Sequence, residues 1–302
     1  MMWWSTWPTS GRGQKRVTKM GSAWFIAAIV SAFALSGQSL AFQRLQQYFP
    51  IKLYLAYVWL GAALVLGLVY LRLADLTAVS HNLIWLILSA LCSLGGIFAY
   101  NRAIQVQSNL GYVEAVMALR IVLTYVVSLV LFDATVDLRR LLGVIFVTIG
   151  VYLVAERIRF HRNAFQLEWV SWALAAGLFF GLLTVFVRLA TDGGVSAQVT
   201  LVFVLLAAGL IFLAGCISDK TPLRPPASRL WLIAVAILFA IIGNAAEFIS
   251  FETTPNLAYA IAIDNTRMII LYVISLFMFT ESLQKVKAVG IGLAFVGVLL
   301  LG

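Results

Sequence analysis

The chain has 302 residues, of which 63% are hydrophobic and 11% are charged, with a formal net charge of +9 and a mean hydropathy of +1.00. This composition excludes an ordinary soluble domain and indicates an integral membrane protein. The basic residues are scattered over short loops and the N-terminal tail, so the positive charge favours contact with the membrane surface over nucleic-acid binding.

The N-terminal tail, residues 1–20, contains Trp and Lys/Arg side chains, which commonly anchor a first membrane span. These basic residues favour a cytoplasmic N-terminus, although more Lys and Arg fall on the other side of the predicted membrane. A cleaved signal peptide ending near Ala32–Ala34 is the alternative. The apolar run is longer than a signal core and has a counterpart later in the chain, which favours a retained span.

Apolar runs of about 20 residues, long enough to cross a bilayer as helices, predict ten membrane spans. They cover residues 22–43, 51–71, 82–103, 109–132, 138–156, 168–190, 196–217, 229–251, 256–279 and 283–302. All six prolines lie outside the span interiors. We therefore expect mostly straight helices, which argues against transporters built on proline-broken half-helices.

The chain is an internal duplication. Residues 96–153 align without a gap on residues 243–300, so each position corresponds to the one 147 residues later. The matches include asparagine, tyrosine, arginine, serine and glycine residues, namely Asn109, Tyr112, Arg120, Tyr125, Ser128, Phe132, Gly143 and Gly150 with Asn256, Tyr259, Arg267, Tyr272, Ser275, Phe279, Gly290 and Gly297. The first and sixth spans align at an offset of 145, which pairs Ala32 and Ser36 with Gly177 and Gly181 and predicts close packing there.

Each half holds five spans, an odd number, so the second half must enter the membrane in the opposite sense. The predicted fold is an all-α membrane protein of ten transmembrane helices arranged as two inverted five-helix repeats. The first repeat would cover residues 21–161 and the second residues 162–302.

Five charged residues lie within the spans: Arg120, Arg267, Glu114, Glu247 and Asp264. Each costs about 3 kcal/mol at the bilayer centre, so they must face the protein interior. Asp264 and Arg267 are three residues apart and can pair along one helix face, and the short turn after Glu247 brings that residue within about two helical turns of Asp264. Salt bridges that only hold helices together remain one interpretation, and a polar cavity is the other.

The cavity is favoured because the two arginines occupy equivalent repeat positions and because polar and aromatic residues surround them. Those residues are Tyr100, Asn101, Tyr112, Tyr259 and Asn265, with Gln38 on the first span. An arginine fork suits a carboxylate or phosphate, whereas the acids suit an amine or a titrating proton. The predicted ligand is a zwitterion or an organic anion. Glu247 or Asp264 could carry a coupling proton, although nearby arginines oppose proton uptake.

The remaining cysteines and charged residues are expected to have structural roles and no part in the site. Cys92 and Cys216 lie inside apolar spans and are predicted to pack as small hydrophobic residues. Arg102, Arg188, His81 and Glu252 lie near span ends, and we expect them to reach the lipid headgroups.

The passage from the fourth span to the fifth, LVLFDATVDLRRLLGVIFVTIGVYLV, and its repeat, LFMFTESLQKVKAVGIGLAFVGVLLL, resemble the EamA family of the drug/metabolite transporter superfamily. The resemblance implies a carrier of the inner membrane, commonly an exporter of amino acids or other small metabolites. It also implies cytoplasmic termini and a central cavity lined chiefly by spans 1, 3, 4, 6, 8 and 9.

The sequence departs from this family at two points. The turn glutamate of the family is present as Glu281, but its first-half counterpart is Ala134, beside Asp133. Where the family often has an acidic residue and a proline in span 4, this chain has Arg120 and, in the repeat, Arg267. The opposite charge favours an anionic or zwitterionic ligand over a cationic drug.

The predicted function is a secondary active transporter, an exporter of small polar metabolites working by alternating access in the plasma (inner) membrane. No GxxxxGK[ST] motif occurs, which excludes ATP hydrolysis by this chain. The sequence predicts no catalytic residue, cofactor, metal or nucleic-acid partner. The predicted partners are a small-molecule substrate and membrane lipids. A homodimer is left open. The alternatives are a flippase for lipid-linked substrates, a structural membrane subunit and, last, a polytopic enzyme, for which His81 and His161 have no neighbouring ligands.

Overall fold

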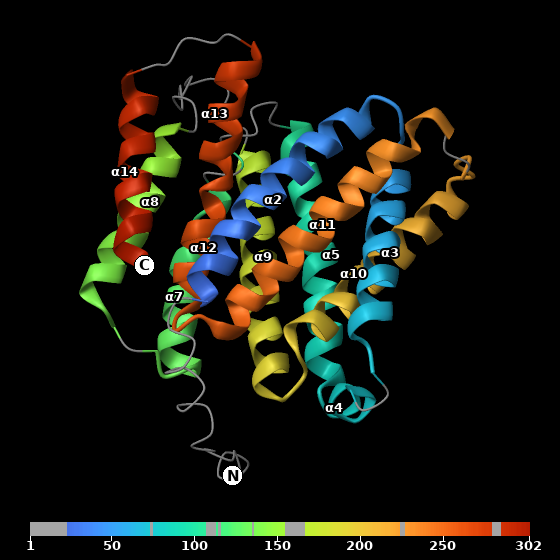
Figure 1. Cartoon of the computed structure of the whole chain (residues 1–302), viewed down its shortest axis with the longest axis horizontal. Coiled ribbons are helices and arrows are strands. Elements are labelled where there is room, and N and C mark those ends of the chain that lie inside the picture. Colours follow the sequence, from blue (N-terminus) through green and yellow to red (C-terminus); the bar gives the residue numbers. More distant parts are fainter. Residues whose placement is uncertain are drawn as a thin grey trace.

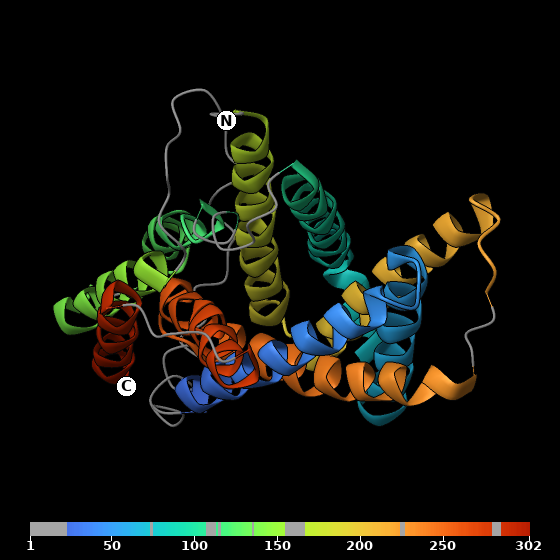
Figure 2. The ribbon, with the colours of Figure 1, turned by 90° about the horizontal axis from the view of Figure 1, so that it is seen from above.

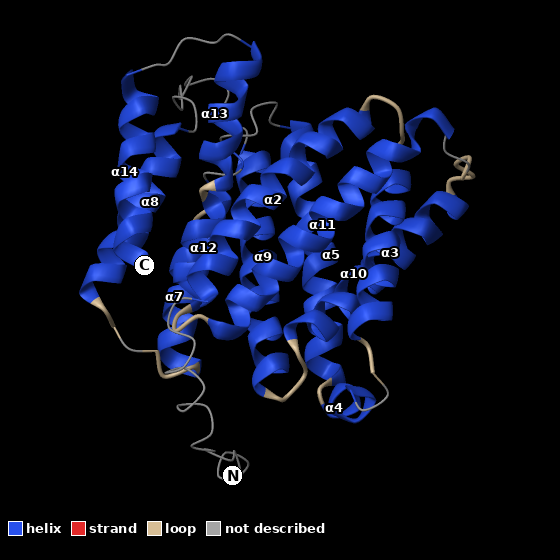
Figure 3. Ribbon diagram, viewed as in Figure 1, coloured by secondary structure: helices blue, strands red, loops and turns tan. Residues whose placement is uncertain are grey.

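The structure is a computed structural model that describes residues 23–72, 75–106, 113, 116–134, 136–154, 167–223, 227–279 and 285–302. These residues form helices joined by short turns (Figures 1 and 3). In chain order the helices are α2 (Ala23–Gln46), α3 (Ile51–Tyr70), α4 (Asp75–His81), α5 (Leu83–Val106), α7 (Arg120–Leu131), α8 (Leu138–Val154), α9 (Leu167–Asp192), α10 (Ala197–Ser218), the 3₁₀ helix η1 (Ala227–Arg229), α11 (Leu230–Thr253), α12 (Leu257–Asn265), α13 (Arg267–Phe279) and α14 (Lys285–Leu301). The predicted tail, residues 1–20, and Glu281 lie outside the described residues.

The described part of the chain contains six helices long and apolar enough to cross a membrane: α2, α3, α5, α9, α10 and α11. They correspond to predicted spans 1, 2, 3, 6, 7 and 8, and they establish a multi-pass membrane protein. The other four predicted spans coincide with the shorter helices α7, α8, the pair α12 and α13, and α14.

The expectation of straight helices is wrong in the ninth span, which divides at Thr266 into α12 and α13. There the backbone forms i→i+3 hydrogen bonds, from Thr266 N to Ile263 O and from Ile269 N to Thr266 O, both 2.9 Å. The Thr266 hydroxyl also donates to Ile263 O at 2.6 Å. A tight turn stabilised by a threonine, and not a proline, therefore interrupts the helix.

The fourth span has a similar turn at Leu119, the residue that corresponds to Thr266 in the repeat. Here Ile121 N bonds to Ala118 O and Val122 N to Leu119 O, both at 3.0 Å. Arg120 and Arg267 are thus the first residues of α7 and α13. The two arginines are presented by the same local backbone geometry.

Four helix pairs make the most extensive contacts: α5 with α9, α2 with α11, α8 with α14, and α3 with α10. In two perpendicular views α8 crosses α14 at one side of the molecule and α2 lies along α11 (Figures 1 and 2). In the repeat alignment α2 corresponds to α9 and α5 to α11. Exchanging each helix for its counterpart therefore converts the α2–α11 pair into the α5–α9 pair. The same exchange leaves the other two pairs unchanged, so the packing repeats between the halves.

Glycines set the distance between α8 and α14. A Cβ atom added to Gly150 would lie 2.6 Å from Gly290 O, and one added to Gly143 would lie 2.8 Å from Gly297 O. These four glycines are the ones that the repeat alignment pairs, Gly143 with Gly290 and Gly150 with Gly297. The glycines conserved between the two halves are therefore the contact faces of an antiparallel helix pair.

We expect Gly150→Ala and Gly297→Ala each to lower the free energy of unfolding by about 1–3 kcal/mol, because the new methyl group meets backbone atoms that cannot move aside. Denaturant unfolding in mixed micelles measures this. Gly292→Ala is the matched control on α14, because a Cβ there meets nothing within 4 Å. A loss as large for Gly292→Ala would show that helix backbone effects, and not close packing, dominate.

Candidate functional site

A cavity of about 680 Å³ lies among helices of both halves. Its wall is formed by residues of α2, α3, α5, α7, α9, α10, α11 and α13, together with Met117. The wall includes every span that the family resemblance implied and adds the second and seventh spans. The two halves therefore contribute the same set of helices to one space.

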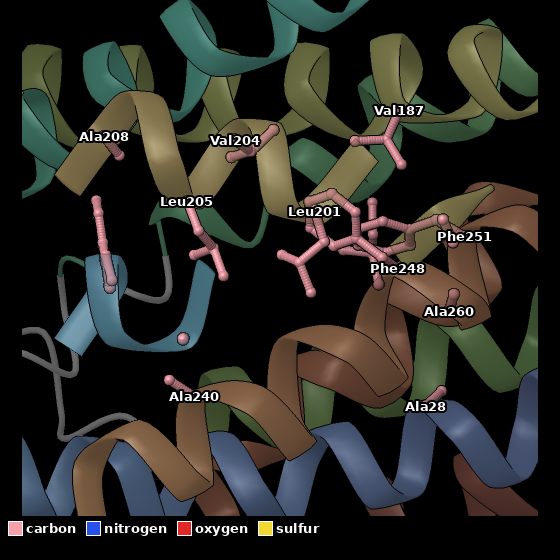
Figure 4. Close-up of a cluster of buried hydrophobic side chains, with 14 of the residues drawn as sticks. Ala28, Val187, Leu201, Val204, Leu205, Ala208, Ala240, Phe248, Phe251 and Ala260 are labelled. Carbon is pink, nitrogen blue, oxygen red and sulfur yellow. The ribbon is translucent and has the colours of Figure 1, made fainter. Parts of the chain in front are cut away.

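The two ends of the cavity differ. At the end formed by the last turn of α2 and the start of α3, the wall includes Gln43, Gln46 and Ile51, whose side chains are exposed. We call this the open end. Towards the C-terminus of α11 the wall consists of buried apolar side chains, among them Leu201, Phe248 and Phe251, which cluster together (Figure 4). We call this the closed end.

Arg120 is held by an ion pair that joins the two halves. Its Nη2 donates to Asp264 Oδ2 at 3.0 Å and to Asn265 Oδ1 at 3.1 Å. The Arg120 and Asp264 side chains are only 7% and 2% exposed. Because α7 belongs to the first half and α12 to the second, this buried pair ties the halves together beside the cavity.

Arg267, the repeat equivalent of Arg120, is placed differently. Its Nη1 lies 3.7 Å from Asp264 Oδ2, its side chain is 22% exposed, and it lines the cavity. Glu247 of α11 also lines the cavity and forms no ion pair with a described residue. Both arginines thus line the cavity and pair with Asp264, and Arg267 is the more exposed of the two.

Small residues on α2 and α9 allow close approach of the helices that carry the arginines. The helix α7, with Arg120, lies against α9, and α13, with Arg267, lies against α2. A Cβ added to Gly181 would lie 3.7 Å from Arg120 Cβ. At the equivalent place Ser36 Oγ, which donates to Ala32 O at 2.7 Å, lies 3.3 Å from Arg267 O. The paired small residues therefore pack against spans 4 and 9, and not against each other.

The predicted site residues fall into three groups. Six line the cavity: Arg120, Arg267, Glu247, Tyr100, Asn101 and Gln38. Asp264 and Asn265 are absent from the wall and act as partners of Arg120. Tyr112 and Glu114 lie outside the described residues.

Tyr259 is a correction to the predicted site. It is 1% exposed, its ring lies 6.4 Å from that of Trp24, and the Arg140 guanidinium lies 5.9 Å from its centre. It is not part of the cavity wall. Tyr259 and Asp264 are five residues apart on α12, so a helical period places them on different faces. In the structure Arg120 and Arg267 both pair with Asp264 and both line the cavity, so buried salt bridges and a polar cavity occur together.

Ser39, Thr184 and Asn244 are among the polar residues of the wall that sequence reasoning missed. Ser39 Oγ donates to Leu35 O and Thr184 Oγ1 to Phe180 O, both at 2.9 Å. A signal was present, because Ser39 and Thr184 are equivalent at the offset of 145 that aligns the first and sixth spans. Two hydroxyls at matched positions inside apolar spans indicate a shared polar surface.

Arg188 near the end of α9 is a second correction. We expected it to reach the lipid headgroups, but its side chain is only 15% exposed. It lies at the closed end and donates to backbone carbonyls at the end of α11.

The comparisons with known proteins bear on this geometry. The EamA-like transporter family model matches the chain over α9 to α14. Residues 167–302 are an EamA-like transporter domain. Its α11 and α13 carry Glu247 and Arg267, so these two charged residues of the cavity belong to the EamA-like domain, and the resemblance expected from the sequence is confirmed there.

A solved crystal structure superposes with a TM-score of 0.74, covering 92% of this chain and 96% of that chain. The two sequences are 15% identical, so this likeness shows the fold alone. It extends beyond the EamA-like domain to nearly the whole chain. No curated protein matches the sequence.

We expect Arg120→Met and Asp264→Leu each to lower the free energy of unfolding by about 3–5 kcal/mol, because each leaves a buried charge without its partner. The double variant should lose clearly less than the sum of the two. A double-mutant cycle of unfolding in micelles measures the coupling. Additive losses would show that the pair contributes nothing as a pair.

Proposed function

We propose that the protein is a secondary active transporter that exports a small zwitterionic metabolite by alternating access. Ten transmembrane helices would form two inverted five-helix repeats, residues 21–161 and 162–302. The exchange-symmetric helix pairs, the matched glycines of α8 and α14 and the equivalent turns before Arg120 and Arg267 support this architecture. In such carriers the site lies where the repeats meet.

One observation carries the proposal. Arg267 and Glu247, of opposite charge, line a single cavity that reaches the surface at one end and is closed at the other. Charges in the middle of membrane spans are costly, so they are retained where they are paired or where they bind. A structural subunit requires the Arg120–Asp264 pair but gives no reason for a charged cavity of this size.

Hydrogen bonding within the wall supports a ligand that carries a protonated amine. The hydroxyl hydrogens of Ser39 and Thr184 are bonded to carbonyls of their own helices, so these oxygens can only accept. Asn101 and Asn244 each use one amide hydrogen in the same way, at 2.8 Å. Together with the Glu247 carboxylate, the wall offers acceptors for an ammonium group.

The opposite charge of the ligand would be bound by Arg267. Its guanidinium presents a planar fork suited to a carboxylate. Arg267 is chosen over Arg120 because its side chain is the more exposed of the two, 22% against 7%, and lines the cavity. Amino acids fit both requirements, and they fit better than organic anions, which bring no positive charge to Glu247.

The cellular setting follows from the family likeness and from the tail. We infer a plasma (inner) membrane location, cytoplasmic termini and outward flux. Glu247 is the candidate for a coupling proton, since it faces the cavity, and the charges that act on it are Asp264, Arg120 and Arg267. Release of the ammonium group would leave Glu247 free to accept a proton for the return step.

Proteoliposomes containing the purified protein should exchange an amino acid from a panel of amino acids and organic acids. Arg267→Gln should reduce this exchange by at least about 100-fold, because it removes a charge-assisted pair of hydrogen bonds. Arg44→Gln is the matched control, since Arg44 is exposed and outside the cavity wall. Wild-type vesicles that exchange nothing on the panel, or an Arg267→Gln variant with full exchange, would contradict the proposal.

Glu247→Gln should abolish accumulation driven by an imposed pH gradient, because the amide cannot take up the proton. Flux can then be followed as radiolabelled substrate with and without the gradient. If the gradient still drives transport in the variant, Glu247 is not the coupling residue.

A further inference from the structure

The closed end of the cavity is held by one side chain that the proposed substrate site does not use. Arg188 Nη1 donates to Phe251 O at 3.0 Å, to Glu252 O at 2.9 Å and to Thr254 O at 3.0 Å. Phe251 is a wall residue of the cavity. The guanidinium therefore fixes the end of α11 where it seals the cavity.

The local sequence explains why α11 needs an external donor. The last carbonyls of a helix lack intrahelical partners, and the N–H that would bond to Phe251 O belongs to residue 255, which is a proline. The next N–H, that of Asn256, donates instead to Thr254 Oγ1 at 3.4 Å. Arg188 supplies the missing hydrogens, and its charge suits the negative end of the α11 dipole.

The same guanidinium reaches three other places. Its Nε pairs with Asp192 at 3.2 Å on α9. Its centre lies 5.8 Å from the ring of Phe132, which follows the last residue of α7. Arg188 thus joins α9 and α11 of the second half to the end of α7 in the first. We call this set of contacts the Arg188 clamp.

The other half lacks the residues for such a clamp. At the offset of 145 the counterpart of Arg188 is Gln43, and at the offset of 147 the counterpart of Pro255 is Ser108. Gln43 is exposed and lies on the cavity wall at the open end. Serine has the backbone N–H that proline lacks, and glutamine has no charge, so the aligned positions of the first half carry neither the proline nor the arginine of the clamp.

We propose that the Arg188 clamp is a gate: it closes this end of the cavity, it must release before that end opens, and its absence at position 43 biases the carrier towards the state described here. This inference rests on the proposed carrier function, because only a carrier opens the two ends of its cavity in turn. Its test reads accessibility alone and needs no substrate. A failure of transport and a failure of the clamp are therefore distinguishable.

The test uses a background in which the buried cysteines are removed, Cys92→Ala with Cys216→Ala. Two reporters at equivalent repeat positions are then compared, Phe42→Cys and Val187→Cys. Phe42 lines the cavity near the open end, whereas Val187 is 0% exposed at the closed end. The labelling rate of each is measured with a membrane-impermeant thiol reagent on purified protein.

With Arg188→Gln, we expect the Val187→Cys reporter to label about tenfold faster, since the charge-assisted hydrogen bonding of Nη1 to the end of α11 is lost. The Phe42→Cys reporter should label no faster than before. Arg44→Gln, which exchanges an exposed arginine next to Gln43, should change neither rate.

Two outcomes would overturn the proposal. If Arg188→Gln speeds both reporters, with a lower melting temperature, the arginine stabilises the fold as a helix cap and gates nothing. If the Val187→Cys rate is unchanged in a variant that remains folded, the closed end does not depend on Arg188.

Discussion

A charge inside the membrane must be bonded to an opposite charge or reach water, and the Arg120–Asp264 pair satisfies that requirement for one of the two equivalent arginines. The pair is nearly inaccessible, with exposures of 7% and 2%, and it links α7 of one half to α12 of the other. Asp264 lies closer to Arg120 than to Arg267, at 3.0 Å and 3.7 Å, and the Arg267 side chain is the more exposed of the two, at 22%. One buried carboxylate thus serves both arginines and leaves one of them more accessible from the cavity.

The two halves keep a common backbone and have diverged in chemistry. Positions 100 and 247 both line the cavity, as do 97 and 244, and 120 and 267. At these places the first half has tyrosine, isoleucine and arginine, and the second has glutamate, asparagine and arginine. Asp264 itself corresponds to Met117. Equivalent geometry therefore produces one shared cavity, while most of its charge comes from the EamA-like domain.

The same divergence separates the two ends. At the closed end Arg188 donates to Phe251 O, for which Pro255 has no N–H to offer, whereas Gln43 and Ser108 occupy the aligned positions in the first half. An inverted repeat of identical halves would have equal preference for both orientations of its cavity. Unequal end contacts are one way in which such a duplicated protein can favour one of them.

The sequence alone determined the membrane class, the long helices, the duplication and the need for Arg120, Arg267, Glu247 and Asp264 to face inward. These follow from composition, from the length of apolar runs and from the cost of charge in lipid, which depend little on the partner helix. Spacing along one helix also suggested that Asp264 pairs with Arg267. The structure contains that pair, at 3.7 Å, and adds a closer one between Asp264 and Arg120, 144 residues away, at 3.0 Å.

Only the tertiary structure decided which arginine lies closer to Asp264. The helical period gives the face of a helix on which a residue lies, but it does not give the neighbouring helix that this face contacts. The same limit explains Tyr259, which packs on Trp24 away from the cavity, and Arg188, which bonds to α11 where a lipid contact was expected. The turns at Leu119 and Thr266 escaped prediction because proline was taken as the signal for a break. They form instead from local i→i+3 hydrogen bonds, which residue composition alone does not specify.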